Sequence, residues 1–210
     1  ACLKLLVDAM PELFVVITGS SAFELAGQVG EPLTGRKVTK YLLPISISEY
    51  ISENKTPKKE LDENLEDMLI YGVYPNAITS DDKEDKIKFL TELVDSYLLK
   101  DILTFKDIKG SRVLFQILSL LAFQIGNEVS INEISTKVGI DNKTIERYLD
   151  LLEKSYIIYR LGAYSKNLRN EITKKSKYYF YDNGVRNTLI NNFNKIEIRN
   201  DIGQLWENFI

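Results

Sequence analysis

The spacing of hydrophobic residues changes along the chain and predicts a different kind of element in each part. Residues 13–17, with the sequence LFVVI, form an unbroken apolar run rich in β-branched side chains. Such a run is typical of a strand buried on both faces of a parallel sheet. A similar run at residues 38–43 predicts a second strand, which Pro44 ends. The first part of the chain is therefore expected to be an α/β structure.

The middle of the chain has the apolar spacing of amphipathic helices. We expect a helix over residues 46–54, where Ser46 and Glu49 have the spacing of a capping box. The sequence GVYP at residues 72–75 predicts a tight turn, and residues 81–101 predict one long helix. This part is expected to be mainly α-helical.

Past residue 110 the pattern predicts three helices followed by two strands. These elements are expected, in order, at residues 114–124, 130–139, 141–154, 156–159 and 177–181. Ser130 and Asp141 have the positions of helix N-caps. Helices joined by a glycine turn and followed by a β-hairpin are typical of a winged helix-turn-helix, so this part is predicted to be α+β.

The strand predicted at residues 13–17 has too few neighbours for a parallel sheet. A strand without polar alternation needs other strands beside it and helices on both faces, and two strands rarely form a stable sheet. The residues that precede it are too few to supply them. We therefore expect further strands before Ala1 in a longer natural protein.

The composition excludes several kinds of chemistry. The chain has no histidine and a single cysteine, Cys2, which excludes Ser-His-Asp and Cys-His catalysis, an intramolecular disulfide and nearly all zinc sites. We expect no metal site in this chain. No apolar run has the length of a membrane span, and the first residues lack the features of a signal peptide. We expect a cytoplasmic protein with no membrane partner.

Six strings, taken in order, together resemble those of one family. That family is the prokaryotic ATPases in which an AAA-like core is followed by a C-terminal domain of unknown function. The strings are LFVVITGSS at residues 13–21, LTGR with LPIS and Glu49 between residues 33 and 49, GVYP at 72–75, YLLKDI at 97–102, KYYFYDNG at 177–184 and GQLWENF at 203–209. One string alone is weak evidence, but the ordered set covers almost the whole chain.

The resemblance implies that a P-loop core upstream binds ATP and Mg²⁺, and that this chain follows the Walker motifs. The implied domains are the end of the AAA-like core at residues 1–50, a helical lid at 51–110, the winged helix-turn-helix at 111–192 and the start of a further region at 193–210. We expect this chain alone to hold no cofactor and to be inactive as an ATPase. GEPLTGRK at residues 30–37 does not replace the phosphate loop, because Arg36 and Lys37 stand where Lys and then Ser or Thr are required.

Three hydroxyl residues and one arginine are the candidate nucleotide contacts. Under the resemblance Thr18, Ser20 and Ser21 are similar to sensor 1, whose hydroxyl would contact the γ-phosphate or the attacking water. They follow a predicted strand at the edge where α/β sheets bind ligands. The alternative is a helix N-cap. Arg36 is a candidate contact to phosphates or to a neighbouring subunit's site, and a surface ion pair is its alternative.

The predicted winged unit carries the candidate nucleic-acid contacts. Basic residues outnumber acidic ones over residues 111–192, although the whole chain has a formal net charge of −3. Recognition helices place residues such as Asn142, Lys143, Thr144 and Arg147 against base edges and phosphates. A basic wing would be formed by Lys166, Arg169, Lys174, Lys175 and Lys177. Acidic residues of the same helix would repel phosphates; they are Asp141, Glu146, Asp150 and Glu153.

Three functions remain open on this evidence. The first is an ATP-driven switch whose lid and winged unit respond to nucleotide. The second is a DNA-binding regulator whose N-terminal part is structural. The third is a protein-interaction adaptor, which the 12 tyrosines favour because tyrosine is enriched at interfaces, although tyrosine also suits β-hairpins. A protein partner or a second copy of the chain fits any of the three.

Overall fold

The computed structural model of the chain describes residues 2–10, 12–19, 38–54, 58–98, 110–162 and 176–210. This described part is a mixed α+β structure, mostly helical, with a small three-stranded antiparallel sheet. The predicted mixture of helix and strand after residue 110 is confirmed at this level.

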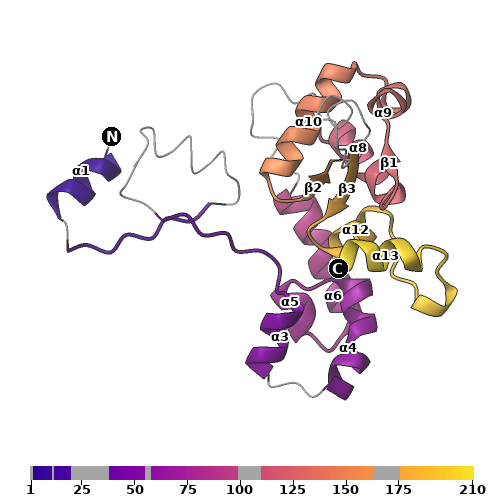
Figure 1. Ribbon diagram of the computed structural model, residues 1–210, viewed down its shortest axis with the longest axis horizontal. Helices are drawn as coiled ribbons and strands as arrows, with labels where there is room; N and C mark the ends of the chain where they lie inside the picture. Colours follow the sequence, from indigo (N-terminus) through magenta and orange to yellow (C-terminus); the bar gives the residue numbers. More distant parts are fainter. Residues whose placement is uncertain (1, 11, 20–37, 55–57, 99–109, 163–175) are drawn as a thin grey trace, which may run out of the picture.

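The two strands predicted near the N-terminus are not formed. After α1 (Cys2–Ala9), residues 12–19 and 38–43 have no helix or strand, apart from single turn and bend positions. Their apolar side chains are exposed, with 90% for Phe14 and 101% for Leu42. Hydrogen bonds to a neighbouring strand define a strand, and no strand of the described part lies beside either run. Figure 1 shows α1 lying away from the rest of the molecule. The α/β core remnant that we predicted therefore has no sheet within the described residues.

A group of helices forms the lower part of the molecule in Figure 1. Its members are α3 (Ile47–Asn54), α4 (Lys58–Tyr71), α5 (Pro75–Thr79), α6 (Lys83–Glu92) and the π-helical η1 (Leu93–Leu98). The predicted capping box of α3 is confirmed, since the N–H of Glu49 donates to Ser46 Oγ at 3.2 Å and the N–H of Ser46 donates to Glu49 Oε2 at 2.9 Å. The single helix predicted over residues 81–101 is instead α6 followed by η1, within the described residues.

The sheet and three helices form the upper part of the molecule. In chain order the elements are α8 (Ser111–Phe123), β1 (Glu128–Val129), α9 (Ile131–Val138), α10 (Asn142–Lys154), β2 (Ile158–Leu161) and β3 (Ser176–Phe180). The strand order is β1-β3-β2, with both pairs antiparallel. The predicted N-caps are confirmed, because Ser130 accepts the N–H of Glu133 and Asp141 accepts the N–H of Thr144.

Three short elements join the two groups. They are α12 (Asn183–Leu189), the 3₁₀ turn η2 (Ile196–Ile198) and α13 (Ile202–Phe209). Helix α12 packs against α4 and α6 on one side and against α8, β3 and α13 on the other. The main apolar core lies between α8, α9, α10, the sheet and α12. The predicted inward residues of α10 belong to it: Ile145, Tyr148, Leu149 and Leu152 are buried.

Candidate functional site

The turn after α4 meets the turn between β3 and α12, and these two turns form a buried polar region. We call this region the junction and define it by Gly72, Val73, Asp182, Gly184 and Asn187. The N–H of Val73 donates to Asp182 Oδ2 at 2.7 Å. The other oxygen, Asp182 Oδ1, caps α12 by accepting the N–H of Val185 at 2.9 Å. A single carboxylate therefore holds both turns.

Burial makes this carboxylate unusual. Asp182 is 3% exposed. Burial raises the pKa of Asp182 to about 6, although backbone N–H groups of Val73, Val185 and Gly184 stabilise its charged form and act in the opposite direction. The neighbouring Tyr74 has its pKa raised to about 12, chiefly by burial and then by the charge of Asp182. The carboxylate is thus held by backbone donors rather than by a basic side chain.

Two glycines allow the backbones to approach at the junction. Gly72 has a φ of 77°, and a Cβ atom built there would lie 2.2 Å from Asp182 Oδ1. A Cβ atom at Gly184 would lie 2.2 Å from the carbonyl oxygen of Tyr71. Both distances are far below van der Waals contact, so a larger residue at either position would push α12 away from α4.

Asn187 completes the contact between α12 and α4. It is fully buried, and its Nδ2 donates to the carbonyls of Leu69 at 3.2 Å and of Ile70 at 2.7 Å. These carbonyls belong to the last turn of α4, where a helix has no intrahelical donors left for them. The amide of Asn187 therefore supplies the C-terminal hydrogen bonds that α4 needs in a buried position.

A buried charged cluster lies on the other side of α12. Arg186 donates through Nε to the carbonyl of Ala122 at 2.9 Å and through Nη1 to Asp201. Arg199 donates to both oxygens of the same carboxylate, at 2.8 Å each. Burial alone would raise the pKa of Asp201, but hydrogen bonds from Arg199 and Arg186 outweigh it and lower the pKa to about 2. The cluster joins α8, α12 and the start of α13.

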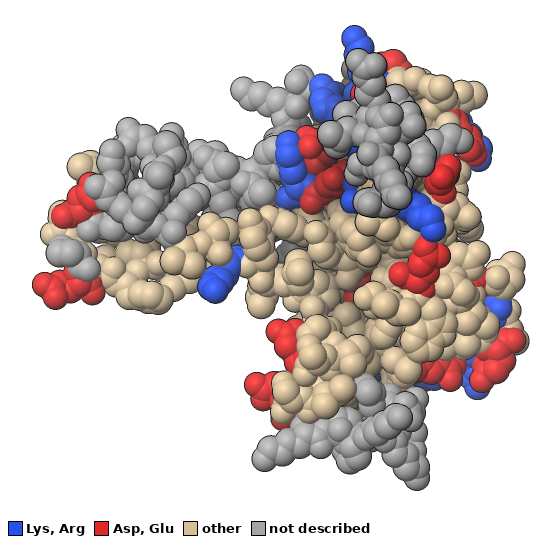
Figure 2. Space-filling model, viewed as in Figure 1, with Lys and Arg blue, Asp and Glu red and all other residues tan. Residues whose placement is uncertain are grey.

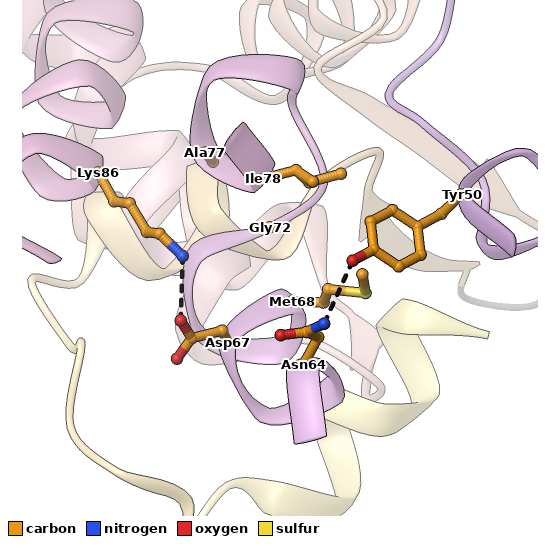
Figure 3. A pocket seen from close by; sticks show the side chains of 8 residues that line it. All are labelled: Tyr50, Asn64, Asp67, Met68, Gly72, Ala77, Ile78 and Lys86. Atoms are coloured by element: carbon orange, nitrogen blue, oxygen red, sulfur yellow. Dashed lines mark hydrogen bonds and ion pairs between the residues drawn. The ribbon is translucent and has the colours of Figure 1, made fainter. Parts of the chain in front are cut away.

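A small pocket lies beside the junction, among the helices of the lower group (Figure 3). Its volume is about 40 Å³, and one wall contains Lys86, which is buried and paired with Asp67 at 3.0 Å. On another wall Asn64 donates to the hydroxyl of Tyr50 at 3.2 Å. Sites for drug-sized ligands have roughly 300 Å³ or more, so this space suits water and not a nucleotide.

The residues predicted to sense nucleotide are not brought together in the described part. Thr18 is exposed in the irregular segment after α1. Ser20, Ser21 and Arg36 lie outside the described residues. Among the described residues there is no cluster of His, Cys, Asp or Glu side chains that could hold a metal ion.

The residues predicted to contact nucleic acid divide into three groups. Lys143 and Arg147 are exposed on α10, one helical turn apart. Asn142 and Thr144 are used within the fold, since Asn142 Nδ2 donates to Asn132 and Thr144 Oγ1 donates to Asp141 Oδ2 at 2.7 Å. Lys166, Arg169, Lys174 and Lys175 lie outside the described residues.

Lys177, the remaining residue predicted to contact nucleic acid, is paired within the fold. It forms an ion pair with Glu207 at 2.8 Å, and the hydroxyl of Tyr179 donates to the same carboxylate at 2.5 Å. The hydrogen bond to Glu207 raises the pKa of Lys177. Lys177 therefore ties β3 to α13. Figure 2 shows blue and red atoms mixed over the upper part of the molecule.

The strings that meet at the junction can be seen in the sequence, but their role cannot. GVYP at residues 72–75 and KYYFYDNG at 177–184 were singled out separately, and the structure brings their residues into hydrogen-bond contact. Asn187, Arg186, Arg199 and Asp201 were not predicted to matter. One signal in the sequence could have indicated them. Residues 182–187, directly after a predicted strand, are mostly polar, which is unusual for a helix buried in a core.

Two family models match the chain. The model of an AAA domain matches residues 1–51. The model described as a domain of unknown function (DUF8612) matches residues 62–196. The second match contains α6, the sheet, α8 to α10, α12 and both sides of the junction. Within the described residues, no helix is both long and apolar enough to cross a membrane.

Several curated proteins are similar to the chain. An uncharacterized protein of Haemophilus influenzae is 30% identical over 183 residues, which cover 84% of this chain and 46% of that protein. An uncharacterized protein of Methanocaldococcus jannaschii is 26% identical over 182 residues, which cover 80% of this chain and 41% of that protein. An uncharacterized protein of Mycobacterium tuberculosis is 22% identical over 213 residues, which cover 99% of this chain and 46% of that protein. The chain thus spans less than half the length of these relatives. No solved structure matches it significantly.

Proposed function

Because the chain belongs to the family described as a domain of unknown function (DUF8612), and because an AAA domain matches the residues before it, we propose that it is the C-terminal part of an AAA-like ATPase. In the intact protein an upstream core would bind ATP and Mg²⁺. Thr18, Ser20 and Ser21 would sense the γ-phosphate, and Arg36 would contact phosphates or a neighbouring subunit. The remainder of the chain would be the part that moves in response.

The observation that carries this proposal is the double role of Val73. Its carbonyl accepts the N–H of Ile45 at 3.0 Å, and Ile45 belongs to the segment that the AAA domain matches. Its own N–H donates to Asp182, at the start of α12. One residue therefore connects the end of the AAA-like segment to the centre of the C-terminal region. A displacement of residue 45 would act directly on the junction.

The upper group of helices and strands would be the effector. The order α8, β1, α9, α10, β2, β3, with an antiparallel sheet, supports its interpretation as a winged helix-turn-helix. Its attachment through Asp182, Asn187 and Arg186 favours movement as one body with α4 and α12, because buried networks of this kind have few alternative arrangements.

Calorimetry with ATP and Mg²⁺ tests the proposal, on this chain and on a longer protein that contains it together with an upstream P-loop. We expect heat of binding from the longer protein only. A Lys→Ala change in its Walker motif should abolish that heat and serves as the matched control. If a longer protein with an intact Walker motif binds no ATP, the proposal is wrong.

DNA binding by the upper group is the second candidate, and the exposure of Lys143 and Arg147 on α10 favours it. Against it, Glu146 and Asp150 are exposed on the same helix. Such an interface would hold phosphates through the two cations and would weaken as salt increases. It is compatible with an ATP-driven switch, in which it would be the output.

A further inference from the structure

Four tyrosines form a connected set of rings on the side of the sheet opposite to Phe180. We call Tyr156, Tyr159, Tyr179 and Tyr181 the tyrosine face. Tyr159 and Tyr179 are partners across β2 and β3, and their rings stack with centroids 5.4 Å apart. Tyr181 makes edge contacts with Tyr159 at 5.4 Å and with Tyr156 at 6.1 Å. Because side chains alternate along a strand, Tyr178 and Phe180 point to the opposite side of the sheet, into the core, while Tyr179 is itself only 4% exposed.

Tyr156 has a backbone conformation that favours glycine. Its φ is 56°, in the left-handed region, where a Cβ atom costs free energy. It ends α10 in the way that Gly139, with a φ of 78°, ends α9. The N–H groups of Tyr156 and Ile157 donate to the carbonyls of Glu153 and Leu152, which is the hydrogen-bond pattern of a Schellman motif. Helix termination therefore does not explain a tyrosine here.

The contacts of Tyr156 indicate why a tyrosine is present at this position. The ring of Tyr41 packs against the ring of Tyr156 with centroids 5.6 Å apart. Tyr41 belongs to the irregular segment at residues 38–43, within the AAA-domain match. Four residues later, the N–H of Ile45 is bound to Val73. The segment thus touches the rest of the chain at two points, through the ring of Tyr41, which stays 65% exposed, and through the N–H of Ile45.

We propose that the tyrosine face is the docking surface for the AAA-like part of this same chain, with residues 38–43 as the docked arm and Tyr41 on Tyr156 as its anchor. A glycine at position 156 would end the helix equally well but would leave the arm without a ring to bind. The docking itself is independent of nucleotide. Its role in transmitting a nucleotide signal rests on the function proposed above.

The experiment measures how well the arm is held in the full chain. Two variants remove the anchor from either side, Tyr156→Gly and Tyr41→Ala. The readouts are amide hydrogen exchange of Ile45, whose N–H donates to the carbonyl of Val73, and tryptic cleavage after Lys40 in the Tyr156 variant, where the cleaved sequence is unchanged. The matched control is Leu42→Ala, which removes a fully exposed neighbour of Tyr41.

We expect both measures to quicken by about 2- to 10-fold, the range that an aromatic pair contributes. The double variant should add nothing to either single variant, because both remove one contact. Leu42→Ala should leave exchange unchanged. Exchange of β2 and β3 amides should also remain unchanged in Tyr41→Ala, which shows that the effect is local and not global unfolding.

Unchanged exchange of Ile45 in Tyr41→Ala would overturn the proposal, and so would additive effects in the double variant. This result can be separated from failure of the ATPase proposal, because no nucleotide is present. If docking is measured but a longer protein binds no ATP, the interface remains and only its role in signalling is lost. If ATP binds but docking fails, another route must connect the two parts.

Discussion

Val73 and Asp182 are 109 residues apart in the chain, and the backbone N–H of one donates to the buried carboxylate of the other at 2.7 Å. The same carboxylate caps α12 through Val185. The helical group and the group that contains the sheet therefore share one acceptor. Substitutions at this junction and at the charged residues around it should therefore change stability or binding in the directions that their geometry indicates.

Replacing Asp182 with alanine should lower the free energy of unfolding by about 2–4 kcal/mol. Two buried N–H donors lose their acceptor, at a cost of about 1–3 kcal/mol each. Removal of a buried charge offsets part of this cost. Urea denaturation followed by circular dichroism measures the change. Asp150→Ala is the control, since Asp150 is exposed and paired with Lys154 on the same helix. It should cost no more than about 0.5 kcal/mol. Equal losses in the two variants would contradict a structural role for the junction.

Gly184→Ala should destabilise by about 1–3 kcal/mol or more, because the added methyl group would lie 2.2 Å from the carbonyl oxygen of Tyr71. Gly203→Ala, in the first turn of α13, is a matched control because nothing lies within 4 Å of its added methyl group. There the gain in helix propensity should leave stability unchanged or raise it by up to about 1 kcal/mol. Thermal unfolding of both variants tests this difference. A tolerated alanine at position 184 would mean that α12 and α4 can separate freely.

The Asp201 cluster should make stability depend on pH in the acid range. The pKa of Asp201 is lowered from 3.8 to about 2 in the folded protein. The contribution of Asp201 to the free energy of unfolding is therefore fully present above about pH 4. It is lost as pH falls from 4 toward 2, because the carboxylate of the unfolded chain takes up a proton first. We expect the difference in melting temperature between the wild type and Asp201→Asn to be largest above pH 4 and to narrow below it. A difference that stays constant from pH 5 to pH 2.5 would show that the ion pairs contribute little.

Charge reversal on α10 separates DNA binding from a purely mechanical role. Lys143→Glu combined with Arg147→Glu should lower duplex affinity by at least about 10-fold at low salt and should make the dependence on salt less steep, by about one unit of slope per lost phosphate contact. Lys154→Glu is the control, since Lys154 is paired with Asp150 near the other end of the helix. Fluorescence anisotropy with a labelled duplex at several salt concentrations measures both quantities. Absence of binding by the wild type at low salt would remove the DNA hypothesis.

Local signals in the sequence were sufficient for the helices after residue 110. The caps at Ser130 and Asp141 and the glycine at 139 were all correctly placed, and so were the buried residues of α10. These features depend on neighbours within a few residues, so the sequence carries them directly. The strand β1 was missed because two residues, Glu128 and Val129, give no periodicity that a pattern can reveal.

The predicted strands at residues 13–17 and 38–43 show the opposite case. Their composition favours strands, but a strand exists only where another strand accepts and donates its hydrogen bonds. The described part provides none beside them. The composition of these runs favours strands, but the tertiary environment determines whether strands form.

The candidate site divides in the same way. By itself the sequence determined the excluded chemistry, since a chain without histidine cannot perform histidine-dependent catalysis, and it determined the strings through which the family resemblance is seen. Only the tertiary structure decided that Asp182 serves Val73, that Lys177 is paired with Glu207, and that Tyr41 lies on Tyr156. The physical reason is that caps and periodicity act between residues close in sequence, whereas the partner of a buried carboxylate or an aromatic ring is selected by packing between segments far apart in the chain.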